Sequence, residues 1–259
     1  MRLPLLILAL VAASGCEKPP VEWQEPTAIP DVGAVSRLVL DSAGRVRFVA
    51  EPALATRPPK FEGLCSTSLR MAAALTRVFG TWWRVRPDSS SLLQVSSSAD
   101  SGKTWAAPSA VDTTDVSSTG CNRPPPSITT VGDDVYVAYS MSAPEGTGVF
   151  FAHSMGAMLH SPVTVIYGER LVPTAIAAEG ERVVVAYDEP NGSRQQIDIA
   201  YSPTQGHIFE WRRTATRDID VATSPSVALA GNVVAVAWAT RRSTDSATSR
   251  VVRVGRIVH

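Results

Sequence analysis

Strongly apolar, β-branched segments recur in the second half of the chain, and each is reached through a similar polar turn. Residues 126–139, 173–187 and 225–238 each contain a short apolar run, a turn with glycine and a Val- and Ala-rich run ending in an aromatic residue. Two apolar runs joined by such a turn are typical of a β-hairpin. The copies start at intervals of roughly 50 residues, so the pattern predicts a repeated antiparallel unit.

Two fainter copies of the hairpin precede these, at residues 35–50 and 68–85. Most copies continue into a third apolar strand, over residues 92–97, 149–154, 197–202 and 251–258. Three copies also show a fourth strand, over residues 107–111, 163–167 and 211–215. Four antiparallel strands repeated in this way are typical of β-propeller blades, so the expected fold is an all-β propeller.

The spacing of the copies predicts about five blades, the first of them too short for four full strands. A distorted six-bladed ring and an open array of blades fit the same pattern. The last blade ends at its third strand, so ring closure requires a strand from the N-terminus, and residues 21–29 are the candidate. Closure of that kind removes an exposed sheet edge.

The turn between the third and fourth strands of the second copy has an unusual composition. It places Ser98, Asp100, Gly102, Thr104 and Trp105 in the pattern Ser-x-Asp-x-Gly-x-Thr-Trp. A carboxylate can accept hydrogen bonds across such a turn, a glycine permits a positive φ, and an indole can pack between strands. The motif resembles the Asp box, or BNR repeat, of sialidase-like β-propellers, and residues 202–209 carry a weaker copy. The resemblance implies a sialidase-like propeller over residues 32–259, in which the box is a structural device.

The N-terminal segment has the composition of an export signal. A basic residue, Arg2, is followed by an apolar run and then by small residues directly before Cys16. This predicts a signal peptide over residues 1–15, too short to span a bilayer. The arrangement is similar to the lipobox of bacterial lipoproteins, which implies acylation of Cys16, with palmitate or a similar chain, and anchoring in the bacterial cell envelope, at the outer membrane. Prolines among acidic residues then predict an extended tether over residues 16–31.

The net charge limits the expected binding partners, and the cysteine count predicts a disulfide. Lysine plus arginine is 24 and aspartate plus glutamate is 24, so no net field favours nucleic acid, and membrane contact is expected through lipid only. With Cys16 used for lipid, Cys65 and Cys121 remain. In an exported protein, two remaining cysteines are expected to form a disulfide.

Candidate ligand-binding residues gather at one end of the predicted blades, the end at which first strands begin and second strands end. We call this end the channel face. The candidates there are charged residues, namely Arg37, Arg70, Arg123, Asp188, Glu189, Asp220 and Arg241. Guanidinium groups pair bidentately with carboxylates, so several arginines near one axis would suit a ligand that carries a carboxylate.

The resemblance to sialidases implies three arginines around the substrate carboxylate, a tyrosine nucleophile paired with glutamate, and an aspartate acid. The chain lacks the Arg-Ile-Pro signature of that family, so these roles are not carried over to particular residues. Tyr187, next to two carboxylates, could serve acid–base chemistry, but its place in the repeat predicts a buried core residue.

Residues 153–160 hold two histidines and two methionines, a set that could ligate copper. Strand alternation is expected to divide these side chains between two faces, so no metal and no cofactor are predicted. The function expected from the sequence is that of a surface-anchored, non-catalytic propeller that binds a glycan or a protein partner. The alternative is a glycoside hydrolase of exo-sialidase type; fold alone does not decide between them.

Overall fold

The computed structural model describes residues 20–29, 36–50, 60–156, 158–192, 194–217, 221–241 and 248–258. The predicted signal peptide, Cys16 and Asp220 lie outside these ranges, as does the side chain of Arg241. Among the described residues, none forms a helix long and apolar enough to span a bilayer.

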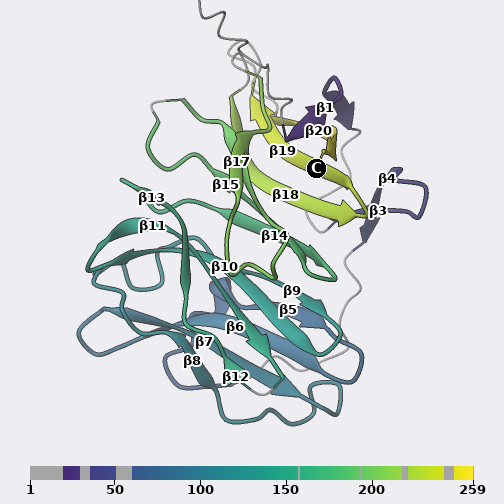
Figure 1. Ribbon diagram of the computed structural model, residues 1–259. Helices are drawn as coiled ribbons and strands as arrows, with labels where there is room; N and C mark the ends of the chain where they lie inside the picture. The colour runs from purple at the N-terminus through teal and green to yellow at the C-terminus, as the bar shows by residue number, and fades with distance from the viewer. Residues whose placement is uncertain are drawn as a thin grey trace, which may run out of the picture.

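The described chain folds into five antiparallel sheets (Figure 1). The smallest is a hairpin of β3 (Ser36–Leu40) and β4 (Val46–Ala50). A short 3-10 helix, η1 (Ser66–Ser68), precedes the first four-stranded sheet, which is β5 (Arg70–Ala73), β6 (Val78–Val85), β7 (Ser91–Ser98) and β8 (Ser109–Asp112). The next sheet comprises β9 (Ser127–Val131), β10 (Asp134–Ala143), β11 (Gly146–Met155), β12 (Met158–Leu159) and β13 (Val163–Gly168). The fourth sheet comprises β14 (Thr174–Glu179), β15 (Arg182–Asp188), β16 (Ile197–Ser202) and β17 (Trp211–Thr214).

The last sheet joins the two ends of the chain. It contains β18 (Ala222–Ala230), β19 (Val233–Arg241) and β20 (Thr248–Ile257), with β1 (Val21–Trp23) and β2 (Thr27–Ile29) both antiparallel to β20. The predicted contribution of residues 21–29 to the last blade is therefore confirmed. The two strands β1 and β2 lie within the segment predicted as a tether, residues 16–31.

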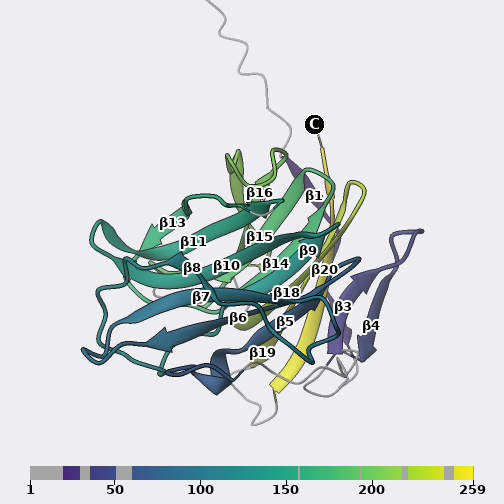
Figure 2. The same cartoon turned by 90° about the horizontal axis from the view of Figure 1, so that it is seen from below.

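The sheets stack face to face, and each interface is an apolar cluster. The β5–β8 sheet packs on the β9–β13 sheet, which packs on the β14–β17 sheet, and that sheet packs on the last one. The β3–β4 hairpin packs on the other face of the last sheet through Leu38, and it lies at that end of the row in both views (Figures 1 and 2). Among the buried clusters of the described residues, none joins the β3–β4 hairpin to the β5–β8 sheet.

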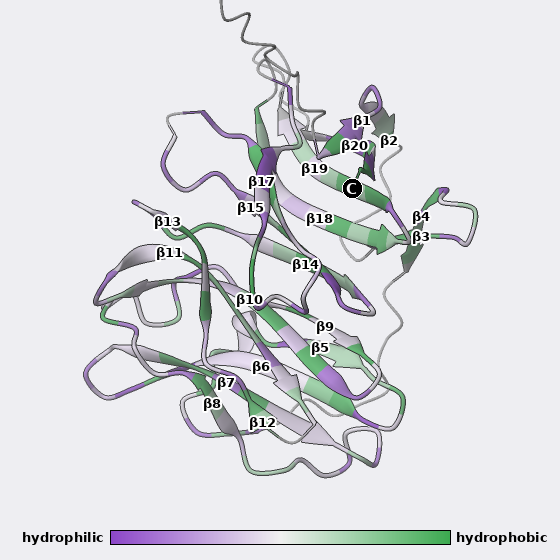
Figure 3. Cartoon of the chain, viewed as in Figure 1, coloured by the Kyte–Doolittle hydropathy of each residue, from purple (hydrophilic) through white to green (hydrophobic). Residues whose placement is uncertain are grey.

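Strand alternation explains why these sheets are apolar on both faces. In β15, Val183 and Val185 face the β9–β13 sheet, whereas Val184 and Ala186 face the last sheet. A strand covered on both faces needs a continuous run of apolar residues, which is the pattern seen in the repeat. Polar residues are concentrated in turns and in outer strands such as β17, which is hydrophilic in Figure 3.

The predicted disulfide is confirmed. Cys65 and Cys121 are bonded, with their Cα atoms 5.5 Å apart. Cys65 precedes η1 and β5, and Cys121 lies in the loop before β9. The bond therefore fastens the entry segments of two neighbouring sheets, and it closes a loop that constrains the unfolded chain.

The Asp box forms the predicted turn between β7 and β8. Asp100 accepts hydrogen bonds from the backbone nitrogen and the hydroxyl of Thr104, at 2.9 and 2.7 Å, and from the hydroxyl of Ser98. These bonds, the backbone bond first, lower the pKa of Asp100 to about 2. Trp105 is half-buried and lies against Gly80 of β6, so it covers the edge of the core instead of being enclosed between strands.

The weaker box between β16 and β17 keeps part of this geometry. The Ser202 hydroxyl accepts the backbone nitrogen of Gly206 at 3.0 Å, as the Ser98 hydroxyl accepts that of Gly102 at 2.7 Å. Gly206 has a φ of 88° and lies directly on the Phe151 ring, which leaves no room for a Cβ atom. This turn therefore packs directly against the neighbouring sheet.

The closure of the last sheet predicts the effect of a charge at Val21. This side chain is buried beside Ile257 in the cluster between the last two sheets. Val21→Asp should lower the free energy of unfolding by about 3 kcal/mol or more, because a carboxylate would be buried without a partner. Denaturant unfolding measures this, with Glu22→Gln on the exposed side of β1 as the control. Equal stability of both variants would show that β1 does not hold the sheet.

Candidate ligand-binding site

The predicted channel-face residues have different surroundings. Arg37 is exposed on β3, and Arg70 is exposed at the start of β5, where its guanidinium donates to the carbonyls of Thr67 and Leu69. Asp188 ends β15 and is half-buried, and Glu189 follows it and is buried. Only part of the predicted set is therefore placed to meet a ligand.

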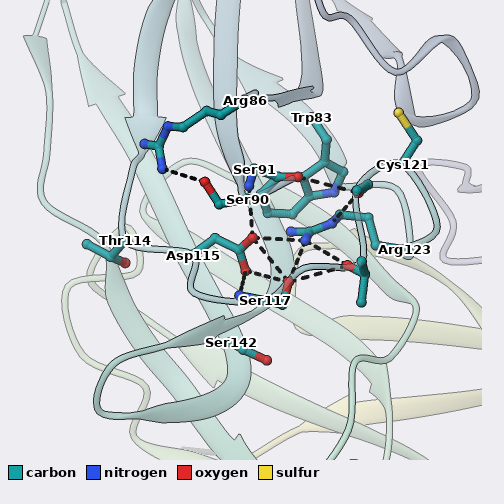
Figure 4. Close-up of polar contacts among 12 residues, drawn as sticks. Trp83, Arg86, Ser90, Ser91, Thr114, Asp115, Ser117, Cys121, Arg123 and Ser142 are labelled. Atoms are coloured by element: carbon teal, nitrogen blue, oxygen red, sulfur yellow. Dashed lines mark hydrogen bonds and ion pairs between the residues drawn. The ribbon is translucent and has the colours of Figure 1, made fainter. Parts of the chain in front are cut away.

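Arg123 is enclosed by its own loop (Figure 4). Its Nη2 atom donates to Asp115 Oδ2 at 2.9 Å, and the two side chains are 0% and 1% exposed. The same nitrogen donates to the hydroxyls of Ser117 and Thr119, and the guanidinium lies 4.6 Å from the centre of the Trp83 ring.

These contacts make Arg123 a structural residue, although the sequence predicted it among the ligand-binding residues of the channel face. Removing it would leave the Asp115 carboxylate buried without its cation, which is strongly destabilising. The Asp115 carboxylate also accepts the backbone nitrogen of Ser91, so the ion pair ties residues 113–123 to β7. The guanidinium is fully buried, so a ligand carboxylate cannot reach it from solvent.

The charged groups of the channel face that do come together lie at the ends of the β9–β13 and β14–β17 sheets. Arg170 is exposed, and its Nη2 atom donates to the backbone oxygen of Glu189 at 2.6 Å. Asp188 accepts the backbone nitrogen of Ser224, from β18, at 3.1 Å. Ser224 has a φ of 58°, an uncommon value for a residue with a side chain, and strain of this kind often marks a functional site.

The Asp188 carboxyl titrates near neutrality. Burial raises its pKa to about 7, although the hydrogen bond from Ser224 and the charge of Arg170 oppose this shift. A carboxyl with this pKa beside a guanidinium can accept or donate a hydrogen bond according to pH.

The loop that follows β15 is fixed by Glu189. Its carboxylate accepts the backbone nitrogens of Asn191 and Gly192, and Asn191 donates to the backbone oxygen of Tyr167. Tyr167 is 48% exposed at the end of β13. The loop therefore contacts the backbone of Tyr167, whereas the Tyr167 ring packs edge-on against Phe150 and lies against Gly146.

Tyr187 is closed off from this surface. Its side chain is 0% exposed, its hydroxyl is buried without a hydrogen-bond partner, and it pairs across the sheet with Asp198. Burial, followed by the Asp198 charge, raises the pKa of Tyr187 well above its usual value, and burial also raises the pKa of Asp198. The structure thus agrees with the prediction that Tyr187 is a core residue.

Arg170 and Tyr167 were missed in the sequence. Tyr167 lies near the end of the fourth strand of its sheet, and Arg170 follows that strand. The repeat predicted only that the starts of first strands and the ends of second strands meet at the channel face. Because a fourth strand is antiparallel to the third, its end lies at that same face, so the register of the repeat held the signal.

No family model and no curated protein sequence matches the chain. Solved structures similar to it include a protein of unknown function from Dyadobacter fermentans, at a TM-score of 0.50 and 15% identity, over 70% of this chain and 50% of that one. The Hadza microbial sialidase Hz136 has a TM-score of 0.47 and 14% identity, over 70% and 45%. Trypanosoma rangeli sialidase in complex with the inhibitor DANA has 0.47 and 13%, over 83% and 39%.

The chain thus spans half or less of the length of these proteins. At such identities the likeness concerns the fold alone. The four-stranded antiparallel sheets of this chain match those of sialidase-type β-propellers.

The raised pKa of Asp188 predicts how stability depends on pH. Because the folded pKa is about 7 and the unfolded value is near 4, ionisation opposes folding, and stability falls as pH rises through this window. Asp188→Asn should remove this slope, which is at most about 1.4 kcal/mol per pH unit.

Denaturant unfolding between pH 4.5 and 8 measures the difference. Asp88→Asn is the control, since hydrogen bonds from the Ser90 side chain and backbone lower the pKa of Asp88, and its loss should leave this window unchanged. Parallel curves for wild type and Asp188→Asn would contradict the prediction.

Proposed function

We propose that this chain is a non-catalytic, glycan-binding propeller, held at the bacterial cell envelope by lipid on Cys16. The observation that carries the proposal is the junction at which the exposed Arg170 guanidinium donates to the backbone oxygen of Glu189 beside the Asp188 carboxyl, with the exposed Tyr167 on the strand that leads to Arg170. The buried state of Tyr187 supports binding without hydrolysis.

The case against sialidase-type hydrolysis concerns access to the nucleophile. Such hydrolysis requires a tyrosine that reaches substrate and is activated by a neighbouring base. Of the five tyrosines in the sequence, Tyr167 is exposed, whereas the other four are buried. Tyr187 and Tyr139 both have raised pKa values, chiefly because of burial, which opposes formation of a phenolate.

The surroundings of the arginines also argue against sialidase-type hydrolysis. Arg123 is held by Asp115 and by the Trp83 ring, so it does not supply the clamp that a sialidase would need for a substrate carboxylate. Arg170 takes a different place, at the end of the fourth strand of its sheet. A single guanidinium beside a carboxyl suits recognition of hydroxyl groups, because one donates and the other accepts hydrogen bonds.

A glycan fits the junction better than a flat protein surface. Binding sites for small ligands combine an apolar or aromatic surface with a few polar groups that fix orientation. Tyr167 offers an exposed ring with a polar tip, and the loop fixed by Glu189 is bonded to the Tyr167 backbone.

The proposed lipid anchor would lie close to the last sheet. β1 begins at Val21, so few residues separate Cys16 from the last sheet. A lipid on Cys16 would keep the sheet that contains β20 close to the bilayer, and several acyl chains on one residue would give stable anchoring.

Acylation predicts labelling at one residue. Cells fed a palmitate analogue should label the wild-type chain, and Cys16→Ala should abolish the label and release the protein from membranes. Expression of both chains is matched by immunoblot. Equal labelling of Cys16→Ala would overturn the anchor and leave the glycan site untouched.

Glycan binding is tested by an array screen with the purified Cys16→Ala chain, followed by calorimetric titration of the best glycan. Arg170→Ala and Tyr167→Ala should each weaken binding by tenfold or more, since each removes a group proposed to contact the ligand. Lys103→Ala is the matched control, because it removes an exposed cation from the Asp-box turn at the opposite end of the sheets.

Two outcomes would contradict the proposal. Release of the fluorophore from a fluorogenic sialoside would show catalysis. An empty array, together with binding of a protein partner that Arg170→Ala abolishes, would replace the glycan by a protein at the same junction.

A further inference from the structure

A cluster of imidazoles lies at the opposite end of the sheets, which we call the box face because it carries the Asp-box turn. His153 and His160 are stacked with ring centres 4.9 Å apart. His207 meets both edge-on, at 4.8 Å from His153 and 5.8 Å from His160. Three of the four histidines in the sequence therefore meet at one point of the fold.

The register of the β11–β12 hairpin puts the methionines on the same side. His160 donates its backbone nitrogen to the carbonyl of His153 at 2.9 Å, and Met155 pairs with Met158. Paired residues, and residues two apart, share a face of a sheet. His153, Met155, Met158 and His160 consequently lie on one face, so the expectation that strand alternation would separate them is wrong.

The third histidine comes from the neighbouring sheet. His207 lies in the weaker box between β16 and β17, directly after Gly206, which is seated on the Phe151 ring. Phe151 is also two residues before His153, on the same face of β11. The contact between Gly206 and Phe151 thus fixes where His207 meets the hairpin.

Two imidazole nitrogens of the cluster are buried without a hydrogen-bond partner. They are the Nε2 atoms of His153, which is 2% exposed, and of His160. A ring nitrogen without a proton is the atom through which an imidazole binds a metal.

The surroundings disfavour a hard cation. Asp134 is the carboxylate whose charge acts on His153, and its Oδ1 atom already accepts the backbone nitrogen of Gly156 and the hydroxyl of Ser154. In the part of the chain that the structure describes, no three His, Cys, Asp or Glu groups are arranged to hold a metal ion. Ligation therefore has to draw on the thioethers and on a turn of the exposed His207 ring.

The methionines are placed for that role. Met155 is 44% exposed and Met158 is 70% exposed, although methionine is usually a core residue. Thioether and imidazole ligands together favour Cu(I) over zinc, calcium or magnesium. The exposed thioethers would also give the ion a route from solvent to the buried nitrogens.

We propose that His153, His160 and His207, with Met155 and Met158, form a Cu(I)-binding site at the box face. The site joins two neighbouring sheets through the hairpin and the weaker box. It lies away from the proposed glycan junction, so neither proposal depends on the other.

The test uses the full chain with Cys16→Ala, so that no free thiol competes while the disulfide remains intact. Cu(I) is titrated without oxygen against a chromophoric Cu(I) chelator. The expected result is one ion per chain. The double variant Met155→Leu and Met158→Leu should lose tenfold or more in affinity, because leucine keeps the shape and removes the thioether.

His207→Gln should weaken binding to a similar extent, and because the side chain is exposed, the substitution should leave the fold intact. Ile208→Ala is the matched control, since it removes an exposed neighbour with no ligand atom. Circular dichroism confirms that all variants are folded.

Three results would overturn the proposal. The chain could fail to compete with the chelator. The double methionine variant could bind Cu(I) as tightly as Ile208→Ala does. Zinc could bind more tightly than Cu(I), with no effect of the methionine substitutions, which would indicate an imidazole site without thioethers.

Discussion

Apolar packing between neighbouring sheets is the interaction on which the rest of this structure depends. Each central sheet buries both faces, as the alternating contacts of Val183 and Val184 in β15 show. Burial of apolar area is the dominant favourable term in folding, and here it occupies nearly every position in the middle of the strands. Groups with chemistry are consequently confined to the two ends of the sheets, and the polar groups that remain inside, such as Tyr187, are closed to ligands.

The two ends serve different purposes because the strands reach them differently. At the channel face, strand ends from two sheets bring Arg170 and Asp188 together over a strained residue, Ser224. At the box face, tight turns lie over the edge of the next sheet, so side chains from one turn meet a neighbouring hairpin. The first arrangement offers a surface to a ligand, and the second builds enclosed sites between sheets.

Much of the architecture could be predicted from the sequence, because the features involved are local or periodic. The hairpins, the Asp box and the contribution of the N-terminal strands follow from apolar alternation and turn residues. The Cys65–Cys121 bond followed from counting cysteines in an exported chain. The position of Arg123 could not be predicted in this way, because its partner Asp115 lies in a loop without any repeat pattern.

The histidine cluster escaped prediction for a related reason. The fact that His153 and His160 share a face depends on the pairing of Met155 with Met158, and a shift of one residue in the register would have separated the two histidines. The approach of His207 depends on how two sheets are packed, which no local pattern records. Contacts between sheets are therefore the part of the candidate sites that sequence periodicity leaves undetermined.

The two box turns show how a structural motif can acquire chemistry. The weaker box keeps Ser202 and Gly206, which fix its backbone and its contact with the neighbouring sheet. It also keeps Phe209, which packs edge-on against Phe151. It has lost the aspartate, whose role is to tie the turn internally. The position after the glycine is unspecified in the motif and points away from the core: it holds Lys103 in one turn and His207 in the other. A turn whose backbone is already fixed by packing can vary this position at little cost in stability, and in the second turn that variation places an imidazole against two others.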